Sequence, residues 1–60
     1  MNSWEFNIGD GVNISPKENG TIIWRAEYIE GPNMFRVEYV TGNGRLVESW
    51  FQASELTKLS

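Results

Sequence analysis

The sequence predicts an all-β fold, a small barrel of five strands, and three observations lead to this expectation. Segments that alternate apolar and polar residues recur along the chain, and this period of two is typical of half-buried strands. Turn residues separate the segments at the short intervals found in small barrels. The 60 residues suffice for one domain with a small core. We expect this domain over residues 6–60, after a tail over residues 1–5 in which Trp4 either lies on the barrel or contacts a partner.

The first strand is expected to follow a glycine-rich bend over residues 9–11, because Gly and Asp favour turns. Val12 and Ile14 alternate with polar residues, so both side chains should point into the core. A loop over residues 15–20 follows, where a proline and an Asn-Gly pair interrupt the alternation.

The longest strand is predicted over residues 21–29. Unbroken alternation assigns every second side chain to the core and the others to the outer face. The predicted core set is Ile22, Trp24, Ala26 and Tyr28, and the predicted outer set is Thr21, Ile23, Arg25, Glu27 and Ile29. A turn over residues 30–33, which contains Gly and Pro, should end this strand.

A β-hairpin is predicted over residues 34–51, with its turn at Asn43-Gly44, because both of these residues tolerate positive φ. The length of the loop decides the register of the two strands. A loop of two or four residues would place Tyr39 on the face of Trp50. A loop of three residues, with Gly44 in a G1 bulge, would place these two rings on opposite faces.

Burial favours the bulged register, because it keeps Glu48 out of the core, where an unpaired charge is costly. Its inner face holds Phe35, Val37, Tyr39, Val47, Ser49 and Phe51. Its outer face holds Arg36, Glu38, Val40, Leu46, Glu48 and Trp50. This register therefore predicts Phe51 in the core and Trp50 outside it.

Residues 52–56 are too few for a helix of ordinary length and predict a single 3₁₀ turn before the last strand. Residues 57–59 should then pair as the closing strand, which gives five strands in all. Closing the sheet into a barrel would remove the free edges that invite aggregation.

The composition excludes several classes of function. The chain has no cysteine and no histidine, so disulfides are impossible and a metal site could use only carboxylates; we expect no metal and no cofactor. Five basic residues are scattered among eight acidic ones, which counts against general binding of duplex DNA. No targeting, membrane-spanning or lipidation signal is visible, so we expect a cytoplasmic protein that does not bind membranes.

A frame of scaffold residues spans most of the chain. It reads Phe6-x-x-Gly9-Asp10-x-Val12, Gly20-x-Ile22, Phe35-x-Val37-x-Tyr39 and Trp50-Phe51-x-x-x-x-Leu56. This frame resembles the SH3-like barrels of Tudor and KOW type, and also the plasmid-borne type II dihydrofolate reductases, which share that barrel. The resemblance implies an SH3-like fold and a small accessory protein of a phage, plasmid or bacterium. Scaffold motifs of this kind indicate fold rather than function.

An enzyme is not expected, because the usual nucleophile–base pairs need the His or Cys that this chain lacks. The type II reductases form tetramers around a pore lined by a Val-Gln-Ile-Tyr run on the fourth strand. The matching positions here read Glu48-Ser49-Trp50-Phe51. The Gln and the Tyr are missing, and the Glu and Trp side chains would crowd the pore, so the resemblance implies only a remote possibility of reductase activity.

The outer face of strands two to four is the predicted binding surface for a protein partner or for a second copy of the chain. Its apolar residues are Ile23, Val40, Leu46 and Trp50, and Arg25 and Arg36 lie among them. Protein interfaces have this composition, an apolar centre within a charged rim that contains arginine. Association would also stabilise so small a domain.

Two other modes of recognition remain open. A single-stranded nucleic acid could stack a base on Trp50 and contact Arg25, Arg36 and Arg45 through its phosphates. Acidic residues alternate with these arginines, which is more typical of cross-strand ion pairs. A cage of aromatic rings could hold a methylated lysine or arginine, as in Tudor-like barrels. Most of the rings are needed in the core, however, and Trp50 is the exception.

Overall fold

The computed structural model describes residues 4–15 and 18–59. The parts of the predicted tail and loop that fall on residues 1–3 and 16–17, and the C-terminal Ser60, lie outside the described residues. The described elements are β1 (Gly11–Ser15), β2 (Glu18–Ala26), β3 (Met34–Val40), β4 (Leu46–Gln52), the 3₁₀ turn η1 (Ala53–Glu55) and β5 (Thr57–Lys58). The fold is therefore all-β, with the 3₁₀ turn directly before the last strand, as predicted. No helix in this part of the chain has the length and apolarity to cross a membrane.

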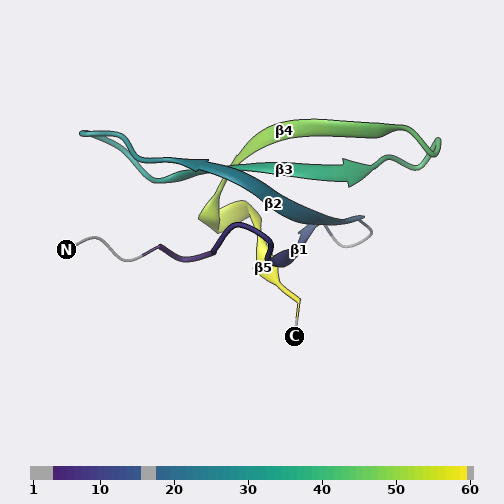
Figure 1. Ribbon diagram of the computed structural model, residues 1–60, viewed down its shortest axis with the longest axis horizontal. Coiled ribbons are helices and arrows are strands. Elements are labelled where there is room, and N and C mark those ends of the chain that lie inside the picture. The colour runs from purple at the N-terminus through teal and green to yellow at the C-terminus, as the bar shows by residue number, and fades with distance from the viewer. Residues whose placement is uncertain (1–3, 16–17, 60) are drawn as a thin grey trace.

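The five strands form one antiparallel sheet in the order β4-β3-β2-β1-β5. The long strand β2 joins its two parts, pairing with β1 near its start and with β3 over most of its length. In Figure 1, β2, β3 and β4 lie together above β1 and β5. The sheet is not closed into the expected barrel: β4 and β5 are its two edges, because the short β5 pairs with β1 instead of bridging to β4.

The core lies on one side of the sheet. Its buried residues are Phe6, Val12, Ile22, Phe35, Val37 and Leu56. Trp4, Ile14, Tyr39, Phe51 and Ala53 pack against them. Phe35 is central, since the rings of Phe6 and Trp4 meet it edge-on with centroids 5.2 and 6.0 Å away. Trp4 thus lies on the sheet, which is the first of the two roles considered for it.

The β3–β4 hairpin has the predicted bulged register, with Tyr39 opposite Val47. The amide of Gly44 donates to the carbonyl of Thr41 (2.8 Å), and the amide of Thr41 donates to the carbonyl of Arg45 (2.8 Å). Gly44 has a φ of 79°, which only glycine adopts freely, whereas Asn43 does not have a positive φ. This geometry is a three-residue loop with a G1 bulge.

Strand β2 begins and ends three residues earlier than the predicted range of 21–29. Its first residues pair with β1, and the side-chain amide of Asn13 fastens this end by donating to the carbonyl of Glu18 (3.1 Å). Much of the predicted loop over 15–20 is therefore strand. At the other end, the connection between β2 and β3 projects from the sheet (Figure 1). Tyr28 lies in this connection and is exposed, so its prediction as a core residue is wrong.

A β-bulge in β2 exchanges the faces of its last residues. Ile22 is opposite Val37, but Trp24 is opposite Arg36, so one extra residue is inserted at Ile23. Beyond the bulge, even-numbered residues point outward, and Trp24 is 59% exposed. The predicted core positions of Trp24 and Ala26 are therefore wrong, as is the outer position of Arg25, which is paired with buried Phe35. A single inserted residue has this effect because side chains alternate with a period of two.

Candidate functional site

The outer face is defined here as the side of β2, β3 and β4 that points away from the core. Strand pairing arranges its residues in four rows that run across the strands. The rows are Ala26–Met34–Gln52, Trp24–Arg36–Trp50, Thr21–Glu38–Glu48 and Val40–Leu46. Residues opposite one another in a row are close enough for their side chains to interact.

The row of Trp24, Arg36 and Trp50 is the most distinctive part of the outer face. Arg36 occupies the middle strand, with one tryptophan on each neighbouring strand. Its guanidinium carbon lies 5.5 Å from the ring centroid of Trp50, a cation–π contact. Its Nε also donates to Glu48 Oε1 at 2.9 Å. The arginine is thus held in place, while both indole rings remain exposed, Trp24 at 59% and Trp50 at 39%.

Val40 and Leu46 form a second apolar pair on the outer face, next to the β3–β4 turn. Both side chains are exposed. The row that contains Glu38 and Glu48 separates this pair from the tryptophans. The outer face therefore has two exposed apolar areas with carboxylates between them.

Four of the six predicted binding residues come together on the outer face, namely Arg36, Val40, Leu46 and Trp50. Ile23 is the inserted residue of the bulge and is half-buried. Arg25 does not join the others, because the bulge turns it to the core side.

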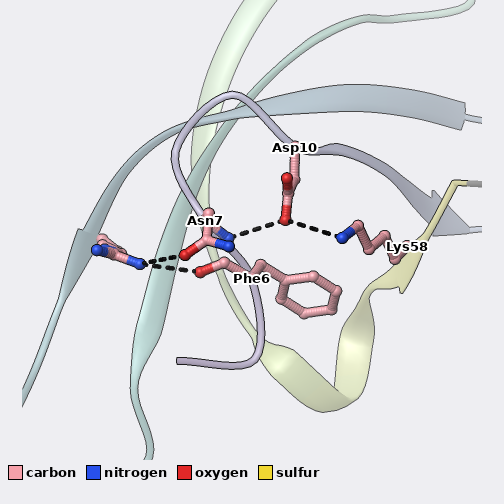
Figure 2. A network of polar contacts seen from close by, with 5 residues as sticks. Phe6, Asn7, Asp10 and Lys58 are labelled. Carbon is pink, nitrogen blue, oxygen red and sulfur yellow. Dashed lines mark hydrogen bonds and ion pairs between the residues drawn. The ribbon is translucent and has the colours of Figure 1, made fainter. Parts of the chain in front are cut away.

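Arg25 instead fastens the N-terminal segment to the sheet. Its Nη1 donates to the carbonyl of Phe6 and to Asn7 Oδ1, both at 3.2 Å. Its guanidinium carbon also lies 4.5 Å from the ring centroid of Trp4. Figure 2 shows Asp10 beyond Asn7, where Oδ2 accepts from the Asn7 amide at 2.9 Å and pairs with Lys58 Nζ at 3.7 Å. These contacts account for Arg25 structurally, without a ligand.

Trp24 is the outer-face residue that unbroken alternation misses. The sequence does carry a signal, because Ile22, Ile23 and Trp24 are three apolar residues in a row. In a regular strand, neighbouring residues point to opposite faces, so a run of three apolar residues must expose at least one of them. A bulge inserts a residue and shifts which face the following residues occupy. This run is therefore the place to expect the inserted residue.

The outer face combines exposed apolar side chains with few charged groups. Among residues 4–15 and 18–59 no three acidic side chains gather closely enough to hold a metal ion. The charged groups in the four rows are one guanidinium and two carboxylates.

Comparison with known proteins finds no family model, no curated protein and no solved structure that matches this chain.

Proposed function

We propose that this protein is a non-enzymatic interaction module that binds a protein partner through its outer face. The observation that carries the proposal is the pair of exposed indole rings, Trp24 and Trp50, on either side of a held arginine. Tryptophan and arginine are the residues most enriched among those that dominate binding energy at protein interfaces. Covering one such ring in a fitted pocket contributes about 2 kcal/mol or more.

The same proposal includes an SH3-like fold family and a cytoplasmic location. The strand order β4-β3-β2-β1-β5, with a 3₁₀ turn before β5, supports the resemblance to SH3-like barrels. A role as a small phage, plasmid or bacterial accessory protein follows from that resemblance.

Single-stranded nucleic acid is the weaker candidate, because few positive charges remain available on the outer face. Arg25 is occupied with the N-terminal segment, and Arg36 is paired with Glu48. One guanidinium against the carboxylates of Glu38 and Glu48 gives the four rows a net charge of −1. Phosphates would meet repulsion here, whereas a protein surface with its own apolar and basic groups would not.

Affinity capture with matched variants tests the proposal. Immobilised wild-type protein and a Trp24→Ala/Trp50→Ala variant are incubated with lysate, and the retained proteins are identified by mass spectrometry. Tyr28→Ala is the control, because Tyr28 is also an exposed aromatic residue but lies outside the strands. We expect at least one partner that binds the wild type and the control and is lost from the double variant. Circular dichroism checks that all three proteins are folded. If every retained protein also binds the folded double variant, the outer face is not the binding surface.

A further inference from the structure

Strand β4 leaves one edge of the sheet open, and nothing in Figure 1 lies beyond it. Natural sheets protect such edges with short strands, charged side chains, prolines or bulges. Of these β4 has one charged side chain, Glu48; its seven residues, Leu46–Gln52, pair with β3 without interruption, and they include no Lys or Pro. The other edge strand, β5, is only two residues long. Of the two edge strands, β4 is therefore the one that can pair with a further strand.

The hairpin geometry identifies the backbone groups that point out from this edge. The bond from Thr41 to Arg45 means that alternate residues from Arg45 onward, the odd-numbered ones, bond to β3. The even-numbered residues of β4 then direct their N–H and C=O groups away from β3. The amide of Gln52 agrees with this assignment, since it donates to Glu55 Oε1 at 2.8 Å. Leu46, Glu48 and Trp50 remain, and within the described residues their backbone groups have no hydrogen-bond partner.

We propose that β4 pairs antiparallel with β4 of a second copy of this chain, about a two-fold axis at Ser49. Residues whose backbone N–H and C=O groups point away from β3 must lie opposite one another in the new strand pair. A two-fold axis that satisfies this condition can pass through Glu48, Ser49 or Trp50. An axis at Glu48 would set two carboxylates directly opposite, which is destabilising. An axis at Trp50 would place Val47 against the partner's Ala53, which lies beyond the strand in η1.

The axis at Ser49 gives complementary pairs over the central residues 47–51 of the strand. Val47 meets the partner's Phe51 on the core side, where both residues are half-buried and apolar. On the outer side, Glu48 meets the partner's Trp50, so no like charges oppose one another. Each Glu48 exchanges both backbone hydrogen bonds with the partner's Trp50. The two sheets thereby become one continuous sheet, and each small core gains a neighbour.

Cysteine cross-linking tests this pairing, because the chain has no cysteine of its own. At the proposed axis, Ser49 and the partner's Ser49 form a non-hydrogen-bonded pair with Cα atoms about 4.5 Å apart, within the range that a disulfide spans. We expect Ser49→Cys to form a covalent dimer in a glutathione redox buffer, seen by non-reducing electrophoresis and mass spectrometry. Ser54→Cys, which is exposed in η1, is the control and should cross-link much more slowly. Equal rates for the two variants would overturn the proposed pairing.

Sedimentation gives a second readout that needs no cross-link. The wild type should sediment as a dimer, and Glu48→Pro as a monomer, because proline removes an outward N–H without breaking a bond to β3. Glu48→Ala should remain dimeric, and circular dichroism checks the fold of each variant. Trp24→Ala should also remain dimeric, since Trp24 lies on β2, away from this edge. A monomeric wild type at the highest soluble concentration, or a Trp24→Ala variant that dissociates, would overturn the proposal.

Discussion

The guanidinium of Arg25 connects the N-terminal segment to the sheet in three ways. It donates to the Phe6 carbonyl and to the Asn7 side chain, and it stacks on Trp4. Cation–π contacts at accessible sites contribute about 0.5–1 kcal/mol, and hydrogen bonds from charged groups somewhat more. Since Trp4 and Phe6 both pack on Phe35, this one side chain helps to cover the centre of the core.

Burial of single side chains can be tested with one chemical change at two sites. Ile22 is fully buried and Ile29 fully exposed, so Ile→Val removes the same methylene group from the core and from solvent. We expect Ile22→Val to lower the free energy of unfolding by about 0.5–1.5 kcal/mol. Ile29→Val should stay within about 0.5 kcal/mol of the wild type. Urea denaturation of both variants gives the comparison, and equal losses would mean that residue 22 is not in the core.

At the scale of elements, the close pairing of β2 with β3 depends on a glycine. A Cβ atom at Gly20 would lie 2.6 Å from Val37 Cγ1 and 2.7 Å from the carbonyl oxygen of Glu38. The second contact is with backbone, which cannot move aside without disturbing the strand pairing. The two strands therefore approach as closely as they do because residue 20 has no side chain.

Alanine substitutions at two glycines test this close approach. Gly20→Ala should lower the free energy of unfolding by about 1–3 kcal/mol, the usual cost of overpacking. Gly42→Ala is the control, because a Cβ there meets no atom within 4 Å and the residue does not have a positive φ. It should lie within about 1 kcal/mol of the wild type or be slightly more stable. Thermal unfolding by circular dichroism measures both, and a Gly20→Ala variant as stable as Gly42→Ala would contradict the packing.

The hairpin and the long strand show which elements the sequence could predict. The β3–β4 register was predicted because the alternative register would bury the charge of Glu48 at a large cost in free energy. The structure has the predicted register. In β2, regular alternation gave no such penalty, because a core Trp24 and an outer Arg25 are each acceptable by themselves. The contacts that hold Arg25 on the core side come from Phe6 and Asn7, nearly twenty residues earlier. Local periodicity contains no information about such distant acceptors.

The same difference applies to the proposed binding surface. The β3 and β4 residues of the outer face were predictable, because the hairpin register assigns them. Regular alternation did not predict the tryptophan contributed by β2, since its position depends on the bulge, for which the run of apolar residues from Ile22 to Trp24 is the only local signal. Closure of the sheet was also not predictable from pattern alone, because it depends on the length and direction of the short last strand.

At the scale of the whole molecule, net charge governs which macromolecules are attracted from a distance. The chain carries five basic and eight acidic residues, a net charge of −3. Long-range attraction to a polyanion therefore has to come from a local cluster of basic groups, and the outer face does not supply one.

We expect no saturable binding to mixed-sequence duplex DNA or to single-stranded oligonucleotides at physiological salt. Fluorescence anisotropy of a labelled oligonucleotide provides the measurement. A salt titration gives the control, because counterion release makes genuine phosphate contacts weaken steeply as salt rises. Binding with such a slope would contradict the charge argument and would favour a nucleic-acid ligand for Trp24 and Trp50.

The inserted residue in β2 also has a consequence for how related chains should be compared. Before Ile23, even positions face the core, and after it they face outward. A relative that lacks this one residue would still place the tryptophan opposite Arg36 on the outer face, because removing an inserted residue restores regular alternation and leaves the pairs on either side unchanged. A one-position gap at residue 23 in an alignment would therefore be compatible with the same row of two tryptophans and an arginine, whereas a gap between Trp24 and Ala26 would change the face of the residues that follow it.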